Sequence, residues 1–202
     1  MPVDWEDRYR RGETRWEKGA PAPPLMEFLA RARICGDVLV PGCGTGHDVR
    51  AIASQGASVL GIDIAASAVR MARENPPVAD ERYEVGDFLA PGAPFGRFDW
   101  LFEHTLFCAI DPERWADYAA SAVASLKPGG MFLAIFYLDP ANVEPGEPPF
   151  PVSPDELDGL FGQEFDLLED WTPRSAHPGR EGRERVRLMR RNPSPARLPS
   201  VR

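Results

Sequence analysis

Short apolar segments rich in Val, Ile and Phe alternate with helical patterns along most of the chain. This alternation is typical of strand–helix–strand units, in which successive strands run parallel and the helices cover the sheet. Near the C-terminus two further segments are joined by a polar loop too long for a tight turn, which favours a closing antiparallel pair. The predicted strands are 37–41, 58–63, 82–85, 98–103, 131–137, 163–171 and 184–192. We therefore predict an α/β protein with a doubly wound, mostly parallel seven-stranded sheet.

Local signals indicate where the helices begin and end. The helix after the first strand is predicted to end at Gly56, because glycine accepts the left-handed conformation that follows a helix. Asp111 is predicted to cap a helix that stops at Lys-Pro-Gly-Gly, residues 127–130. Past a proline-rich loop, Ser153 and Glu156 form a capping box for a short helix.

The length and charge of the chain exclude several classes of protein. A chain of 202 residues fits one compact domain and leaves little room for a second. Because 43% of its residues are hydrophobic, it can bury a core, which excludes wholesale disorder. It carries 23 Lys and Arg residues against 31 Asp and Glu residues, a formal net charge of -8. That charge opposes phosphate backbones and anionic lipids, so we expect no nucleic acid and no membrane as partner.

The termini and cysteines indicate a cytoplasmic protein. The N-terminus is charged throughout, unlike a signal peptide, and the longest apolar run, 131–138, is too short to span a bilayer. The three cysteines, Cys35, Cys43 and Cys108, are odd in number and form no CxxC pair. We therefore expect reduced thiols, no disulfide framework and no metal site.

A glycine-rich turn follows the first predicted strand and opens a helix: Gly42-Cys43-Gly44-Thr45-Gly46. Glycines at such a turn let a ligand approach the backbone closely and present amide N–H groups to it. The spacing is GxGxG, and His47 stands where a dinucleotide-binding GxGxxG fingerprint needs glycine. The turn therefore favours a ligand other than a pyrophosphate, although similar turns also occur as structure alone.

Two acidic residues follow the next two strands. Asp63 ends the second strand, where a carboxylate can accept hydrogen bonds from both hydroxyls of a ribose. Asp87 follows the third strand and is expected at the same edge of the sheet. The alternative for Asp63 is a helix cap, which Ser67 could also supply. Together with the glycine turn, the two acids indicate an adenosine pocket.

The combination VPGCGTG, GID, VGDFL and LKPGG resembles the class I S-adenosylmethionine-dependent methyltransferases. Trp5, Tyr9 and Trp16, with FEHTLFCAI at 102–110 and IFYLDP at 135–140, resemble the thiopurine, thiol and halide methyltransferase family within them. The resemblance covers about residues 4 to 191, and the halide and thiocyanate branch is the most similar. It implies a Rossmann-like fold, S-adenosyl-L-methionine as cofactor and a small soft nucleophile as acceptor.

The resemblance also implies roles for individual residues. It places Trp5, Tyr9, Trp16, Gly42, Cys43, Gly44, Asp63, Asp87, Phe88 and His104 at the cofactor, and His104 and Tyr137 at the acceptor. Tyr9 stands where tryptophan is usual, and His104 where the halide branch has tyrosine and the thiopurine branch arginine. The identity of the acceptor therefore stays open, as does the question whether His104 or Tyr137 acts as a base.

The N-terminal aromatics have their own interpretation from spacing. Trp5, Tyr9 and Trp16 are four and seven positions apart, which could align their rings on one helical stripe, and such stripes commonly pack on a domain. Gly12 interrupts the helix, however, and a broken, charged segment with aromatic rings also suits a lid near a sulfonium. We predict a lid at residues 1–20, a single catalytic domain at 21–192 and a flexible tail at 193–202.

We predict in-line methyl transfer from S-adenosylmethionine to a thiol, hydrogen sulfide, thiocyanate or halide, by a monomer. An activated sulfonium needs alignment and exclusion of water more than it needs a base. An apolar pocket formed by Trp16, Phe107 and Tyr137 would desolvate the acceptor. The alternatives are methyl transfer to a larger acceptor (a thiopurine, amine or carboxylate), a nucleotide-dependent oxidoreductase, and a non-catalytic adenosine-binding protein.

Overall fold

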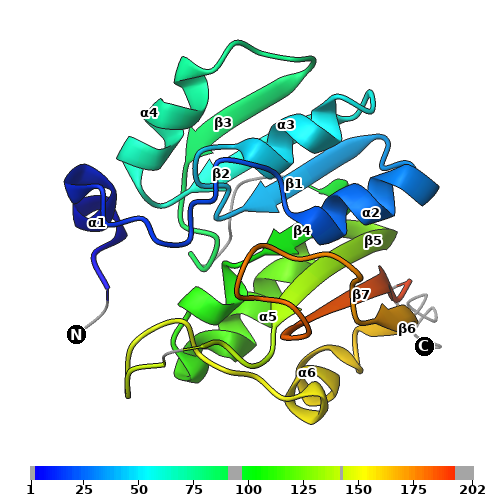
Figure 1. Cartoon of the computed structure of the whole chain (residues 1–202). Coiled ribbons are helices and arrows are strands. Elements are labelled where there is room, and N and C mark those ends of the chain that lie inside the picture. Colours follow the sequence, from blue (N-terminus) through cyan, green and yellow to red (C-terminus); the bar gives the residue numbers. More distant parts are fainter. Residues whose placement is uncertain (1–2, 91–96, 142, 194–202) are drawn as a thin grey trace, which may run out of the picture.

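A computed structural model of the chain describes residues 3–90, 97–141 and 143–193. Its seven strands form one sheet in the order β3-β2-β1-β4-β5-β7-β6 (Figure 1). The strands are β1 (Asp37–Pro41), β2 (Ser58–Asp63), β3 (Glu81–Val85), β4 (Phe98–His104), β5 (Leu126–Tyr137), β6 (Phe165–Trp171) and β7 (Glu184–Arg191). β1 to β5 are parallel, and β7 lies antiparallel between β5 and β6. The predicted mostly parallel sheet with a closing antiparallel pair is confirmed.

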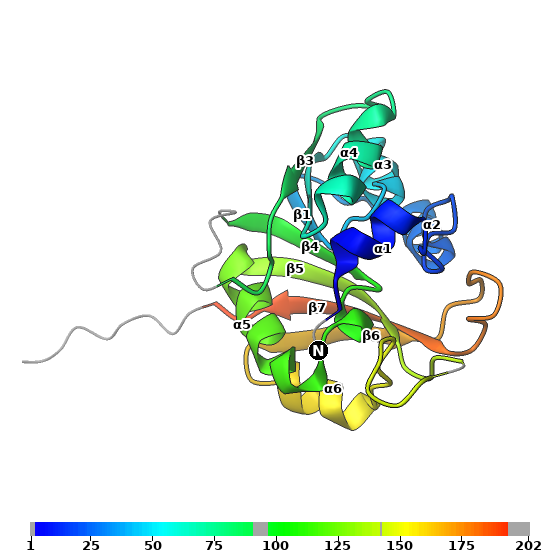
Figure 2. The same cartoon turned by 90° about the vertical axis from the view of Figure 1, so that its left-hand side faces the viewer.

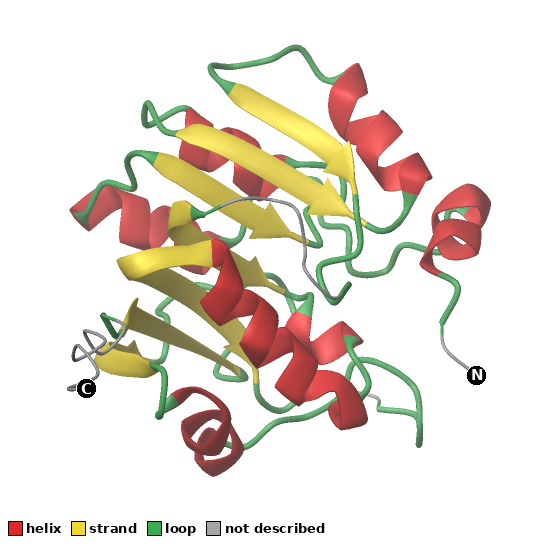
Figure 3. Ribbon diagram, turned by 180° about the vertical axis from the view of Figure 1, so that it is seen from behind, coloured by secondary structure: helices red, strands yellow, loops and turns green. Residues whose placement is uncertain are grey.

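Helices cover both faces of this sheet (Figures 2 and 3). They are α1 (Trp5–Arg11), α2 (Pro23–Arg31), α3 (His47–Ala53), α4 (Ala66–Glu74), α5 (Trp115–Ser125) and α6 (Pro154–Phe161), with the 3-10 turns η1 (Phe107–Ala109) and η2 (Pro112–Arg114). The buried side chains of α2, α3 and α4 join one hydrophobic cluster, and those of α5 and α6 join another. The two clusters lie on opposite faces of the sheet, as a doubly wound fold requires.

The end of α3 and the start of β5 differ from the predicted boundaries by three residues or more. α3 ends at Ala53 rather than at Gly56, because the N–H groups of Gln55 and Gly56 bond carbonyls three residues back and tighten the end of the helix. β5 begins at Leu126 rather than at residue 131, directly after α5 ends. Leu126 pairs with Phe98 of β4, and a bulge in the ladder accommodates the residues that follow.

The predicted capping box of α6 is confirmed, whereas Asp111 caps a 3-10 turn and not α5 itself, which begins at Trp115. The N–H of Glu156 donates to Ser153 Oγ at 3.2 Å, and the N–H of Ser153 donates to a carboxylate oxygen of Glu156 at 2.8 Å, which completes the capping box of α6. Asp111 caps η2, which runs directly into α5. Of the predicted tail, residues 194–202 lie outside the described residues. Within the described ranges, the helices are too short or too polar to cross a bilayer.

Candidate functional site

The carboxyl ends of the parallel strands meet at one edge of the sheet, and the candidate residues lie there. Asp63 ends β2, His104 ends β4 and Tyr137 ends β5. Because β7 runs in the opposite direction, it begins at this edge, and Glu184 pairs with Tyr137. The strand directions therefore bring the loop before β7 to the same place as the glycine turn after β1.

The glycine turn has a left-handed backbone that only glycine adopts without strain. The φ angles of Gly42, Gly44 and Gly46 are 61°, 54° and 84°. A Cβ atom built on Gly44 would lie 3.0 Å from the hydroxyl of Tyr9, so a side chain there would fill the space above the turn. Cys43 packs behind the turn against Gly61. A Cβ atom built on Gly61 would lie only 3.0 Å from the Sγ of Cys43, so the glycine leaves room for this side chain. The turn is therefore shaped to admit a ligand close to its backbone.

Asp63 is buried directly behind this turn. The N–H of Gly44 donates to Oδ2 of Asp63 at 2.9 Å, and the N–H of Ala65 donates to Oδ1 at 2.9 Å. Burial raises the pKa of Asp63, although the two N–H donors favour its charged form. Since each carboxylate oxygen accepts more than one hydrogen bond, Asp63 retains lone pairs for a ligand's hydroxyls.

The predicted helix-cap alternative for Asp63 and Ser67 is wrong. α4 begins after Ala65, which is its N-cap residue and has no side chain able to accept a hydrogen bond. Ser67 lies inside the first turn of the helix, and its N–H and hydroxyl both donate to Glu6 of α1, at 2.8 and 2.7 Å. The start of α4 is thus connected to the N-terminal segment.

The three N-terminal aromatic residues form one cluster, but not along a single helix. α1 ends at Gly12, whose φ is 71°, and the chain then turns back so that Trp16 meets the other two rings. The Trp16 ring centroid lies 5.2 Å from that of Trp5 and 5.6 Å from that of Tyr9, edge to face in both cases. Trp16 Nε1–H donates to the Tyr9 hydroxyl at 3.0 Å. The predicted break at Gly12 is confirmed, whereas the continuous helical stripe is wrong.

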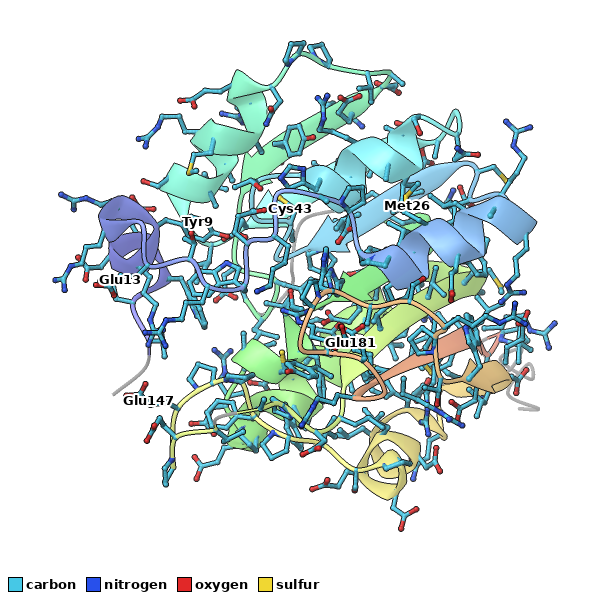
Figure 4. The ribbon with its side chains drawn as sticks, in the orientation of Figure 1. Tyr9, Glu13, Met26, Cys43, Glu147 and Glu181 are labelled. Atoms are coloured by element: carbon cyan, nitrogen blue, oxygen red, sulfur yellow. The ribbon has the colours of Figure 1, made fainter. Side chains whose placement is uncertain are left out.

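This cluster packs on the start of α4 and over the glycine turn. Tyr9 is buried against Ala65 and Ala68, and its side chain points from α1 toward the body of the domain (Figure 4). On the other side of α1, Arg8 lies 3.7 Å from Glu147 of the proline-rich loop. The N-terminal segment therefore contacts both flanks of the candidate site.

A second contact fixes the segment after α1. The Glu17 carboxylate accepts a hydrogen bond from Thr45 Oγ1 and lies 3.3 Å from Nε2 of His47. Thr45 belongs to the glycine turn and His47 begins α3. The N-terminal segment is thus held on the turn by a polar contact as well as by aromatic packing.

Asp87 and Phe88 follow β3 at the same edge. Asp87 is partly exposed, and its Oδ1 accepts the N–H of Leu89 at 2.8 Å. The Phe88 ring is buried, with its centroid 5.3 Å from that of Tyr118 on α5. The Asp87 carboxylate is therefore open to a ligand, whereas the Phe88 ring is largely taken up by core packing.

His104 lies at the centre of a chain of charged side chains. Its Nδ1 is 2.8 Å from Oδ2 of Asp48, and its Nε2 is 3.2 Å from Nη1 of Arg180. The same Arg180 nitrogen lies 3.3 Å from Oε1 of Glu184, and the guanidinium stacks 5.0 Å from the centroid of the Tyr137 ring. We call Asp48, His104, Arg180 and Glu184 the His104 network. It joins α3, β4 and the start of β7.

The charge states in this network have identifiable causes. Asp48 is buried, which by itself favours the neutral acid, but the charge and hydrogen bond of His104 and the N–H of Ala22 lower its pKa. Burial raises the pKa of Glu184, against the opposing effects of His104 and Arg180. His177 stacks on His104 with ring centroids 6.2 Å apart, and burial and nearby cations lower its pKa.

Sequence patterns did not predict Asp48, His177, Arg180 or Glu184. Asp48 lies two residues after the glycine turn, and the antiparallel direction predicted for the last strand places its first residues at the site. The sequence therefore indicated where Asp48 and Glu184 would lie, but not their contacts. His177 has no metal-ligand spacing in the sequence and comes to His104 only through the long loop before β7. Among the residues with described placement, no cluster of three or more His, Cys, Asp or Glu side chains could hold a metal ion.

The predicted apolar pocket is wrong at Phe107. Its ring stacks on Trp115 with centroids 4.9 Å apart and is 1% exposed. Glu103, also buried, accepts the N–H of Phe107 at 2.8 Å and the hydroxyl of Tyr118 at 2.6 Å. These bonds turn the chain inward after His104. Burial raises the pKa of Glu103 to about 7, and that of the neighbouring Cys108 thiol to about 12, so this cysteine is no activated nucleophile.

Comparison with known proteins gives a consistent result. A family model described as thiopurine S-methyltransferase matches residues 2–192. A probable thiol methyltransferase 2 of Arabidopsis thaliana is 33% identical over 161 residues, which cover 78% of this chain and 70% of that protein. Thiocyanate methyltransferase 1 of Brassica oleracea is 35% identical over 153 residues, covering 74% of this chain and 67% of that protein.

Solved structures show the same fold. A 1,6-didemethyltoxoflavin-N1-methyltransferase from Burkholderia thailandensis, solved with its substrate and S-adenosylhomocysteine, superposes with a TM-score of 0.71. The match has 18% sequence identity and covers 92% of this chain and 84% of that one. At this identity, the likeness supports the fold alone.

Proposed function

The chain belongs to the thiopurine S-methyltransferase family and is a methyltransferase that uses S-adenosyl-L-methionine, and from this premise we propose that its acceptor is a small soft nucleophile: a thiol, hydrogen sulfide, thiocyanate or a halide. The observation that carries the proposal is Arg180, a buried guanidinium stacked on Tyr137 and bonded to His104 at the carboxyl edge of the sheet. It gives a compact polarizable anion a local positive partner. The net charge of -8 offers such an anion no long-range attraction.

The residues that would hold S-adenosylmethionine fit that molecule. The open left-handed turn at Gly42, Cys43 and Gly44 admits the methionine end, and the buried Asp63 behind it receives the ribose hydroxyls. We place the adenine beside Asp87 and Phe88, and the aromatic residues Trp5, Tyr9 and Trp16 over the cofactor, with His104 beside the methionine moiety. When bound, the cofactor supplies a methyl group on a positively charged sulfur, which is already an activated electrophile.

The residues of this chain then have to bind, orient and desolvate. The aromatic cluster covers the site against water, and aromatic faces attract a sulfonium by ~0.5–2 kcal/mol. Arg180, Tyr137 and His104 direct the acceptor toward the methyl group. We assign the lid to residues 1–20, the catalytic domain to 21–192 and the tail to 193–202.

Replacing Trp16 with alanine tests the lid. Trp16 makes two edge-to-face contacts and one hydrogen bond in the cluster, and aromatic pairs contribute about 0.5–1.5 kcal/mol each. We expect S-adenosylhomocysteine to bind about tenfold more weakly to this variant, measured by calorimetry. Trp100→Ala is the matched control and should leave affinity unchanged, because Trp100 lies near the start of β4, at the opposite edge of the sheet, and makes an edge-to-face contact with Phe28. Loss of thermal stability without loss of affinity would show that the cluster only packs on the domain.

Replacing Tyr137 with phenylalanine tests the acceptor side. The ring that supports Arg180 is kept, while the hydroxyl, which accepts the N–H of Ala141 at 3.3 Å, is removed. We expect kcat to fall several-fold more than cofactor affinity. Tyr83→Phe is the control, because the buried Tyr83 hydroxyl has no partner among the described residues. Equal losses in turnover and affinity would mean that Tyr137 is only a cofactor contact.

The alternative acceptors are separated by product analysis. Family membership already excludes the oxidoreductase and non-catalytic alternatives. The enzyme is incubated with S-adenosylmethionine and, in parallel, with hydrogen sulfide, small thiols, thiocyanate, iodide and thiopurines, and methylated products are measured in headspace and solution. We expect product from at least one small soft nucleophile. Methylation of the thiopurines alone would establish the larger acceptor and refute the proposal.

A further inference from the structure

The hydrogen bonds of His104 define its tautomer. Asp48 accepts the N–H of Ala22 through one carboxylate oxygen, at 2.7 Å, and faces His104 with the other, and a carboxylate only accepts hydrogen bonds. Nδ1 of His104, 2.8 Å from Asp48, therefore carries the proton. Arg180 only donates, so Nε2 of His104, 3.2 Å from its Nη1, presents a lone pair. When its ring carries a single proton, His104 thus directs Nδ1–H at Asp48 and the lone pair of Nε2 at Arg180.

The charges around His104 favour uptake of one proton. The network contains two carboxylates, Asp48 and Glu184, and one guanidinium, Arg180. His177, whose own pKa is lowered, stacks on the His104 ring. The buried Glu103 precedes His104 on β4. With neutral His104 and both carboxylates ionised, the four residues carry a net charge of about -1, so a proton on Nε2 brings them to zero. A proton-free anion also gains the Arg180 guanidinium as a partner, but it brings no proton to cancel the remaining negative charge of the network.

We propose that His104, oriented by Asp48, accepts the proton of an S–H acceptor, and that the preferred substrates are therefore thiols or hydrogen sulfide rather than thiocyanate or halides. This inference rests on the proposed function and specifies its acceptor. His104 is the catalytic residue, because it touches the acceptor. Asp48 is a positioning residue that acts through His104.

The proton and electrons balance in this step. The S–H bond of the acceptor breaks, its electron pair stays on sulfur, and a new N–H bond forms at Nε2 of His104. The lone pair of Nε2 accepts an N–H of Arg180 at the start, so that N–H has to turn away before the proton can bind there. The released N–H then donates to the thiolate, while Glu184 and Tyr137 hold the rest of the guanidinium. The thiolate sulfur bonds to the methyl carbon as the bond from that carbon to the donor sulfur breaks with its electron pair. The imidazolium finally returns its proton to water.

Asp48→Asn is the variant that separates this role from a structural one. Asparagine keeps the size of the residue and a carbonyl oxygen that can accept the N–H of Ala22, now 2.7 Å from Asp48. It removes the charge that favours a proton on His104. We expect kcat/KM for an alkyl thiol to fall at least about tenfold, because general bases typically contribute 10²–10⁴-fold. For thiocyanate, which carries no proton, we expect a change of less than about threefold.

A second readout does not depend on activity. In the protein without donor or acceptor, the nitrogen chemical shifts of the His104 imidazole report which ring nitrogen carries the proton. Asp48→Asn should abolish the preference for Nδ1, because the carboxylate that accepts its N–H is gone. Asp166→Asn, which weakens an exposed 3.0 Å contact with Arg190 on the far strands, is the matched control and should change neither the tautomer of His104 nor the kinetics. The His47 ring, which contacts Glu17 instead, serves as an internal reference in the same spectrum.

Each outcome has a distinct meaning. Equal losses of kcat/KM for thiol and thiocyanate, or an unchanged His104 tautomer in Asp48→Asn, would overturn the inference while leaving methyl transfer intact. No product from wild-type enzyme with any acceptor would instead refute the proposed function. A greater penalty for alkyl thiols than for more acidic aromatic thiols supports His104 as the proton acceptor, because the acidic thiols are already ionised.

Discussion

Asp63→Ala is expected to lower the affinity for S-adenosylmethionine by at least about 100-fold, or about 2.7 kcal/mol. The carboxylate accepts the N–H groups of Gly44 and Ala65 at 2.9 Å each, so its loss releases the glycine turn as well as the ribose acceptor. Hydrogen bonds to a charged group are worth about 1.5–3 kcal/mol each, enough to account for this loss. Calorimetry with S-adenosylmethionine measures it directly.

The control for Asp63 is asparagine at the same position. Asp63→Asn keeps one acceptor oxygen for Gly44 or Ala65, and we expect an intermediate affinity. Circular dichroism and thermal unfolding establish that both variants are folded. Near-normal affinity in folded Asp63→Ala would refute the ribose role.

The largest effect on stability is expected at Glu103. Burial raises the pKa of Glu103 to about 7 from an ordinary 4.5. Between these two pH values, the folded protein therefore holds a proton on Glu103 that the unfolded chain has released. The stability that this carboxyl contributes is complete below about pH 4.5 and is lost as the pH rises through 7, at a cost on the order of 3 kcal/mol. Glu103→Gln should therefore match the wild type in free energy of unfolding at pH 5 and exceed it by about that amount at pH 8.

A second substitution shows that the effect comes from charge. Glu103→Ala leaves the N–H of Phe107 and the hydroxyl of Tyr118 without their acceptor, so it should be less stable than the wild type at both pH values. Urea unfolding at pH 5 and pH 8 gives the free energies for all three proteins. If the free energy of unfolding of Glu103→Gln exceeds that of the wild type by the same amount at both pH values, the effect does not come from the charge of Glu103.

The sheet could be predicted because its signals are local. Buried strands such as 37–41 and 58–63 match the observed β1 and β2, since continuous apolar runs bounded by turn residues have few other solutions. The start of β5 could not be predicted in the same way. Leu126 joins the sheet by pairing with Phe98, a contact 28 positions away in sequence that outweighs the turn preference of the Lys-Pro-Gly-Gly residues.

The candidate site was predictable where strand ends define it. Asp63, His104 and Tyr137 reach one edge because parallel strands end there. The partners of His104 were not predictable, because Arg180 arrives through a loop whose path depends on packing. Phe107 was misplaced for a similar reason. Its neighbour in space, Glu103, accepts its N–H and turns the ring into the core, and no sequence pattern encodes that bond.

Transfer of a labelled methyl group tests the central claim most directly. The enzyme is given S-adenosylmethionine labelled on its methyl carbon, with an alkyl thiol as acceptor, and both the methylated thioether and S-adenosylhomocysteine are quantified. The account predicts labelled thioether and S-adenosylhomocysteine in equal amounts, each dependent on enzyme and on Asp63. Formation of S-adenosylhomocysteine without labelled thioether, or no consumption of the donor with any small sulfur or halide acceptor, would contradict it.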